Sequence, residues 1–185
     1  RRQRQMCIRD SLNLIPHCFF AGSIHYWLYR KKGQDKKFKF DKRDPAKDNG
    51  VYTFRDQVKD NMFWTICSGI TIWTFFQAIV LWAMANGFAP VLTFSESPIL
   101  FILVFPALVV WASFHFYWIH RFLHWPPMYR IAHALHHRNV NVGPWSGISM
   151  HPIEHFLFYT NFLVHFILAS SPLHLMFHGY MQSIH

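Results

Sequence analysis

The sequence predicts an all-α, integral-membrane helical bundle with a histidine-rich cap at one end. The chain is 52% hydrophobic and only 15% charged, whereas soluble domains average about 25% charged residues. Several apolar segments approach or exceed the ~20 residues that a membrane-spanning helix needs. Eight of the 14 histidines fall between Phe114 and His155. We therefore expect about three full spans, a short C-terminal hairpin, and a cap on the cytoplasmic side.

The distribution of positive charge supports a membrane protein over a nucleic-acid-binding one. The formal net charge is +9, but nine of the 18 Lys and Arg residues lie between Arg30 and Lys47. None lies between Lys59 and Arg121, and none follows Arg138. Basic residues gathered on one side of the spans are typical of cytoplasmic loops. We expect no nucleic-acid partner.

The chain reads as one membrane domain over residues 12–185, incomplete at its C-terminus. Residues 1–11 do not fit this pattern, and we interpret them as an artefact or a disordered tail; a basic targeting segment is the alternative. Residues 12–29 are apolar and predict the first span, or else an interfacial helix.

The middle of the chain alternates polar loops with apolar spans. Residues 30–49 predict a solvated basic loop, and residues 51–61 an amphipathic helix at the interface. A full span is expected over 62–84. Residues 86–97 carry turn residues and no base, as expected on the opposite side, and a second full span over 99–119 returns to the cytoplasm.

The C-terminal third is expected to fold as shorter helices. Pro126 and Pro127 stop the helix that precedes them, and residues 129–137 restart one. Two apolar arms, 156–170 and 173–185, are too short to cross a membrane alone. They predict a re-entrant or short hairpin.

The histidine-box region, residues 115–155, contains three groups of histidines. Residues three or four apart share one face of a helix, so the members of each group project together. Seven convergent imidazoles exceed the four ligands of a tetrahedral zinc site and suit two metal ions held close together. Imidazole binds iron, zinc, copper and nickel, so ligand type leaves the metal open. The three groups are His120 and His124; His133, His136 and His137; His151 and His155.

The remaining histidines are expected to be structural. A lone histidine on an apolar face is usually hydrogen bonded within the protein. We assign this role to His17, His25, His115, His165, His174 and His178.

The strings HRFLH, HALHH and HPIEH beside a membrane segment resemble the histidine boxes of the fatty acid hydroxylase/sterol desaturase superfamily. The preceding YWIHR is similar to the first box of that family. The resemblance covers roughly residues 60–185. It implies a non-haem di-iron enzyme that uses O2 to hydroxylate or desaturate a lipid, a sterol or a fatty acyl chain. A further HxxHH-like box is expected near the C-terminus, and its absence implies a C-terminally truncated fragment.

The resemblance also implies the ligand set and the partners. His185 is carried over as a ligand that follows the hairpin. Electrons would come from a cytochrome b5- or ferredoxin-type donor, which the basic loop could dock. The membrane would be the endoplasmic reticulum in a eukaryote or the inner membrane in a bacterium. The expected metal ligands are His120, His124, His133, His136, His137, His151, His155 and His185.

No catalytic residue is expected beyond these ligands. Glu154 either accepts an N–H from a ligand histidine and fixes its orientation, or forms a salt bridge or a hydrogen bond to a loop amide. No dinucleotide-binding fingerprint is present in the sequence, so we expect no nicotinamide or flavin domain.

Two other functions compete with the oxygenase. A metal transporter would use histidines as transit sites, but such residues should lie within the spans rather than at their ends. A degenerate enzyme would explain the missing box. The sequence does not distinguish a hydroxylase from a desaturase, because both reactions begin with hydrogen abstraction.

Overall fold

The computed structural model describes the backbone of residues 2–35, 37–39 and 41–184, and the side chains of residues 13–35, 37–39 and 41–183. Within these ranges every regular element is an α-, π- or 3-10 helix, and no strand is present. Two isolated β-bridges are present in these ranges: Lys47 pairs with Asp56, and Val91 pairs with Ser170. The all-α prediction is confirmed.

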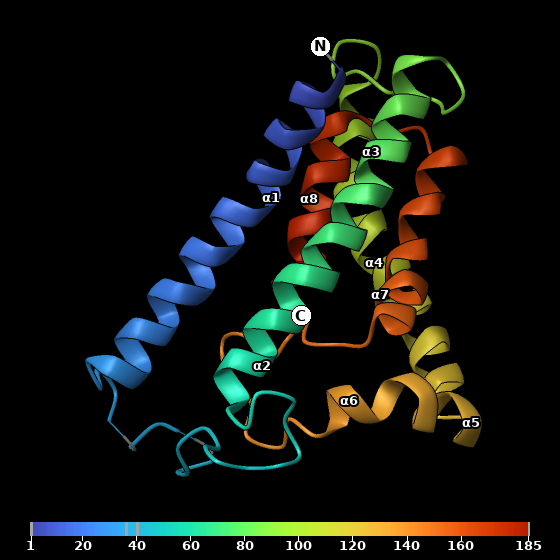
Figure 1. Ribbon diagram of the computed structural model, residues 1–185. Coiled ribbons are helices and arrows are strands. Elements are labelled where there is room, and N and C mark those ends of the chain that lie inside the picture. The colour runs from blue at the N-terminus through green and yellow to red at the C-terminus, as the bar shows by residue number, and fades with distance from the viewer. Residues whose placement is uncertain (1, 36, 40, 185) are drawn as a thin grey trace.

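α1 (Arg2–His25) is a long helix at the side of the bundle, and it continues as a π-helical turn, η1 (Tyr26–Arg30). It slants away from the other helices toward its C-terminal end (Figure 1). The Asn13 side chain fastens it to α3 (Thr71–Ala85) by donating to Thr74 Oγ1 at 3.0 Å and to Gln77 Oε1 at 2.8 Å.

Two helices in the described part of the chain have the length and hydropathy of a membrane span, and α1 is not one of them. A span over residues 12–29 therefore stays a prediction. The interpretation of residues 1–11 as a tail or an artefact also stays a prediction.

The first candidate span is a continuous helical run, Gln57–Ala85, made of α2 (Gln57–Trp64), η2 (Thr65–Ile70) and α3. The expected interfacial helix over 51–61 is not separate from it. The helix begins at Gln57, where the Asp56 side chain accepts a hydrogen bond from the Lys59 N–H at 3.0 Å and caps the first turn. Half of its most apolar 18-residue stretch is buried, so this run is a central element of the bundle.

The second candidate span is α4 (Pro98–Leu123). Pro98 occupies the first turn, where its missing N–H costs no hydrogen bond. Only 17% of its most apolar window is buried, and Ile99, Ile102 and Val110 are among the exposed apolar side chains. α4 thus lies at the perimeter and presents a large apolar surface outward.

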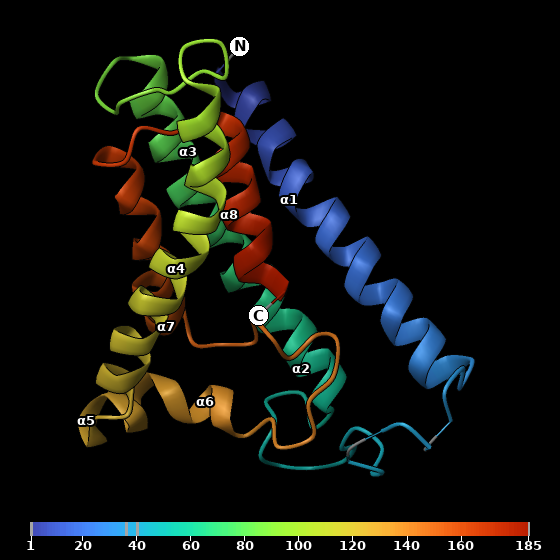
Figure 2. The same cartoon turned by 180° about the vertical axis from the view of Figure 1, so that it is seen from behind.

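Three short helices lie across one end of the bundle: α5 (Pro126–Met128), η3 (Tyr129–His133) and α6 (Ala134–His137) (Figures 1 and 2). Trp125 is extended before Pro126, so α4 ends and the chain turns sharply here. Pro126 and Pro127 therefore stop the helix as predicted.

The C-terminal segment runs away from the crosswise helices and returns. α7 (Pro152–Tyr159) and η4 (Thr160–Phe166) lead outward, and α8 (Pro172–Ile184) comes back in contact with α3 and α4 (Figure 1). Fully buried Trp73, Tyr159, Phe162 and Leu175 form the core between these helices. This is the hairpin arrangement expected from the break at Pro172.

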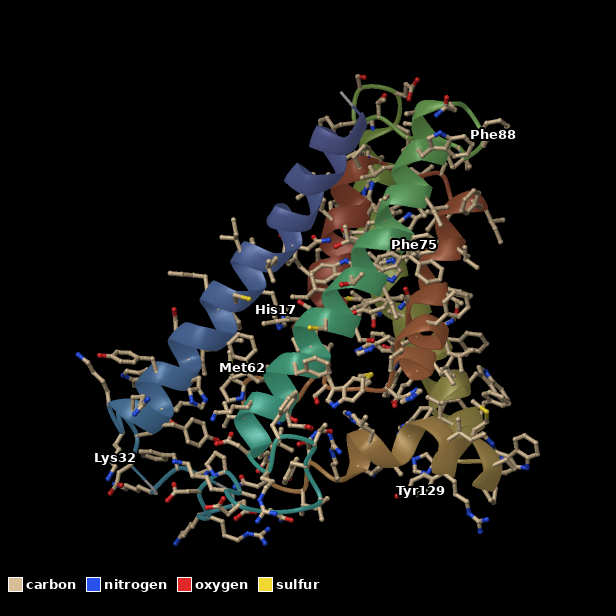
Figure 3. All side chains as sticks on the ribbon, viewed as in Figure 1. His17, Lys32, Met62, Phe75, Phe88 and Tyr129 are labelled. Carbon is tan, nitrogen blue, oxygen red and sulfur yellow. The ribbon has the colours of Figure 1, made fainter. Side chains whose placement is uncertain are left out.

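The basic loop and the crosswise helices lie at the same end of the molecule. Figure 3 places Lys32 and Tyr129 at one end and Phe88 at the other. The two candidate spans run in opposite directions, so the chain returns to the end at which the first of them begins.

Candidate metal centre

Four histidines converge where α4 meets the crosswise helices. Their potential ligand atoms all lie within 4.8 Å of one another. His120 and His124 come from the end of α4, and His133 and His137 come from η3 and α6. We call His120, His124, His133 and His137 the histidine quartet.

Local sequence explains the convergence. Each pair is spaced by four residues, so both rings project from one side of their helix. The Nε2 atoms of His120 and His124 are 3.2 Å apart, and those of His133 and His137 are 2.9 Å apart. The turn at Trp125–Pro126 then carries the second pair beneath the first, with ring centroids of His124 and His133 4.8 Å apart.

The quartet is open on one side. His133 is buried, His120 is partly exposed, and His124 and His137 are exposed. The group therefore has one buried inner ring and two outer rings in contact with the surroundings.

Glu154 fixes the orientation of the buried member. Its Oε1 lies 2.7 Å from His133 Nδ1, and both side chains are buried. With Nδ1 held by the carboxyl group, His133 Nε2 faces the other rings. The first of the two contacts considered for Glu154 is therefore present, and it resembles the carboxylate–histidine pairs that orient metal ligands.

Burial favours the neutral forms of both partners. It lowers the pKa of His133 to about 4, with a smaller contribution from His124. It raises the pKa of the Glu154 carboxyl to about 7. Near neutral pH His133 is uncharged, which is the form of imidazole that binds a metal.

His136 lies beside the quartet but not within it. Its ring centroid is 5.9 Å from that of His133, and its Nδ1 is 3.4 Å from the Ser149 carbonyl oxygen. It lines a neighbouring cavity of about 490 Å³ together with His137. Burial lowers the pKa of His136 as well, so this ring is also neutral.

The histidines of HPIEH occupy other surroundings. His151 is the N-cap of α7, and its Nδ1 accepts a hydrogen bond from the Ile153 N–H at 3.2 Å. His155 is fully buried between Ser68 Oγ and the Ile148 carbonyl oxygen, each 2.9 Å from one ring nitrogen. The structure therefore does not bring these two histidines into the quartet.

His185 lies outside the described residues. Its predicted ligand role stays a prediction. The same holds for the ligand roles of His136, His151 and His155, although the two ring nitrogens of His155 already have partners.

Sequence reasoning did not identify the residues that hold the second box in place. Buried Asp60 pairs with Arg138, the residue after His137, and also accepts a hydrogen bond from the Thr53 N–H at 2.9 Å. Gln57 Nε2 donates to the Asn141 carbonyl oxygen at 2.6 Å. These contacts form a clamp between the start of α2 and the chain that follows the quartet. The sequence did contain one signal for this clamp: Asp60 is an acidic residue in a largely apolar helical run, and acidic residues are rarely buried without a partner.

The donor set of the quartet fits a transition-metal ion. Four imidazoles converge, and the buried one is oriented by a carboxyl group. Such nitrogen-rich sites suit iron, zinc, copper or nickel.

Comparison with known proteins points in the same direction. The fatty acid hydroxylase family matches residues 105–185, which include the quartet. A Delta(7)-sterol 5(6)-desaturase of Aspergillus fumigatus is 36% identical over 62 residues, covering 34% of this chain and 18% of that protein. A probable Delta(7)-sterol 5(6)-desaturase of Neurospora crassa is 38% identical over 52 residues, 28% of this chain and 15% of the relative.

A third relative is the Delta(7)-sterol 5(6)-desaturase of Candida albicans, 31% identical over 51 residues, which cover 28% of this chain and 13% of that protein. The chain thus matches less than a fifth of the length of these curated relatives. No solved structure matches the chain.

Proposed function

Because the chain belongs to the fatty acid hydroxylase/sterol desaturase superfamily, we propose that it is part of a membrane oxidoreductase that hydroxylates or desaturates a lipid. The observation that carries this proposal is the histidine quartet at the end of a membrane-type helix. Unactivated C–H bonds resist ordinary side chains, so their oxidation needs a redox metal or cofactor. The quartet offers ligands for such a metal.

We propose His120, His124, His133 and His137 as ligands of one iron ion. His136 lies close enough to serve a second iron, and His151 and His185 remain candidates for the same ion. His155 is the weakest candidate, because binding would cost both of its present hydrogen bonds. Bound iron would supply the capacity to activate O2 and oxidise a C–H bond.

The residues around the quartet have separate roles in this proposal. Glu154 holds the proton at His133 Nδ1 and so keeps His133 Nε2 free for the metal. The Asp60–Arg138 clamp fixes the segment that follows His137. Phe116, Met150 and Phe158 line the adjoining cavity and would keep water from the substrate.

The proposed setting is a multi-pass membrane protein with the quartet at the cytoplasmic surface. The two candidate spans, the expected first span over 12–29 and the C-terminal hairpin would form the membrane part. The basic loop lies at the same end as the quartet, which supports a cytoplasmic position by the distribution of positive charge. The membrane would be the endoplasmic reticulum in a eukaryote and the inner membrane in a bacterium.

Electrons would reach the metal from a separate protein. We propose a cytochrome b5- or ferredoxin-type donor, because such donors present acidic surfaces that the basic loop could attract. The loop and the quartet share one end of the bundle, so a donor bound there would lie on the same side as the metal.

Metal analysis with Mössbauer spectroscopy tests the proposal. The chain should be purified in detergent, reconstituted with iron, and assayed for lipid products with O2 and a reduced donor. A coupled iron pair and an oxidised lipid are expected. Zinc alone, or no stoichiometric metal after reconstitution, would favour the transporter or the degenerate enzyme, and zinc uptake into liposomes would identify the transporter.

A further inference from the structure

The cavity beside the quartet is built for an uncharged, largely apolar molecule. It measures about 490 Å³ and lies next to His136 and His137. Phe116, Met150 and Phe158 supply apolar walls. Among its described lining residues there is no Lys, Arg, Asp or Glu, so a charged group placed there would lose its hydration without gaining a counter-ion.

A second cavity lies beside this space, against α1. It measures about 590 Å³ and is lined by Phe19, Phe20 and Ile24 of α1. Val142 and Gly147 line both cavities, so the two adjoin at this loop. α1 slants away from the bundle on this side (Figure 2). An apolar molecule could therefore approach His136 and His137 laterally, along apolar surface.

One polar side chain in the first cavity lacks any partner. Gln182 on α8 has no exposed surface, and neither its Nε2 nor its Oε1 has a hydrogen-bond partner among the described residues. A buried polar group left unpaired destabilises the folded protein. Such a group at a cavity wall indicates a ligand that supplies the missing hydrogen bond.

A second buried amide repeats this pattern. Asn139 lines the same cavity, and its Nδ2 has no partner in the described part of the chain. Its Oδ1 lies 3.5 Å from Gln57 Nε2, so one side of this amide is already used. The Asn139 N–H groups and the whole Gln182 amide thus lack a hydrogen-bond partner among the described residues that line this cavity.

The side-chain amides of Gln182 and Asn139 determine which polar group of a ligand fits this cavity. An amide both donates and accepts hydrogen bonds, and so does a hydroxyl group. A carboxylate or a phosphate would call for Arg or Lys, which this cavity lacks. We propose that Gln182, assisted by Asn139, is a specificity-determining residue that receives the hydroxyl group of an uncharged lipid alcohol.

This inference rests on the proposed function, and it adds a rule for the position of reaction. Anchoring the hydroxyl group at Gln182 fixes which carbon of the lipid lies beside His136 and His137. Hydroxylation or desaturation would then occur at a set separation from the hydroxyl group.

Binding to the unaltered, metal-free chain in nanodiscs tests the inference first. The probes are dehydroergosterol, a fluorescent sterol, and its 3-deoxy analogue, followed by energy transfer from tryptophan. One to two hydrogen bonds predict roughly tenfold tighter binding of the alcohol. Equal affinity for the two probes would overturn the proposal.

A variant pair then assigns the preference to Gln182. Gln182→Leu keeps the size of the side chain and removes the amide, so the preference should fall to about onefold while the 3-deoxy probe binds as before. The matched control is Gln77→Leu, because the Gln77 amide is buried but bonded to Asn13 and the Leu175 carbonyl oxygen. Tenfold preference retained in Gln182→Leu would refute the role of Gln182. If Gln182→Leu does not fold, Gln182→Met makes the same comparison.

A charged competitor and an activity assay complete the test. Cholesterol should displace dehydroergosterol, and cholesterol sulfate should not; equal displacement would overturn an uncharged ligand. Failure of the proposed function gives a different result. An iron-loaded protein without oxidised product, but with intact preference for the alcohol, would reject the oxidoreductase and keep the binding site.

Discussion

The histidine quartet and the buried histidines of the hairpin region have the same side chain in opposite surroundings. In the quartet the Nε2 atoms of His120, His124, His133 and His137 face one another. His155 instead contacts Ser68 Oγ and the Ile148 carbonyl oxygen, and His174 contacts Ser171 Oγ and the Phe101 carbonyl oxygen. Spacing in the sequence therefore says less about ligation than the partner of each ring nitrogen does.

The largest expected effect is the loss of metal from the quartet. His133→Ala removes the one buried ring and should lower iron affinity by more than the ~100-fold that losing an orienting partner costs. Metal per folded chain, measured after iron reconstitution, checks this. His115→Ala is the matched control, because His115 lies on α4 but contacts Thr160 Oγ1 at 3.0 Å. Unchanged iron in His133→Ala would place the metal elsewhere.

The second prediction concerns His155, whose loss should affect stability rather than iron binding. His155→Ala should leave the iron content of the folded chain unchanged but reduce the free energy of unfolding by about 2–4 kcal/mol, because two buried hydrogen bonds and a packed ring are lost. Denaturation in detergent measures the stability. Loss of iron from a protein that is still folded would instead support His155 as a metal ligand.

The third prediction concerns the link between the two regions, Glu154. Glu154→Leu removes the acceptor for His133 Nδ1 and should weaken iron binding about 10–100-fold. Glu154→Gln keeps an acceptor oxygen and should retain most of the affinity. Iron titration followed by absorbance compares the two variants. Equal affinities in both variants would show that orientation of His133 does not depend on this contact.

The smallest effect is expected outside both regions, on the basic loop. Changing Lys31, Lys32, Lys37 and Lys39 to Gln should slow reduction by purified cytochrome b5 roughly three- to tenfold at low salt and flatten its salt dependence. The same four positions changed to Arg keep the charge and should reduce at the normal rate. Stopped-flow measurements at several salt concentrations decide. Identical rates in the Gln and Arg variants would exclude docking on this loop.

Local chemistry made much of the fold predictable. The apolar runs predicted the helices that are found over Gln57–Ala85 and Pro98–Leu123. Pro126 and Pro127 predicted the end of α4, and this turn is what brings the first two histidine boxes together. These features depend on residues that are near neighbours in the chain.

The surroundings of HPIEH were not predictable in the same way. Ser68, the partner of His155, lies 87 residues earlier in the sequence, and no local pattern pairs them. Part of the signal was present, however. Pro152 at the first turn of α7 makes the residue before it the N-cap, so the role of His151 could have been read from the sequence.

The Asp60–Arg138 clamp has a consequence for the order in which the chain assembles. Its two members are 78 residues apart, and the accompanying contact between Asn141 and Arg43 joins residues 98 apart. During synthesis Asp60 exists long before Arg138, and a buried carboxylate without its counter-ion is costly. We therefore expect the Asp60 end of the first candidate span to pack only after the second span is complete. We expect the clamp, which holds the segment after His137, to form last at this end.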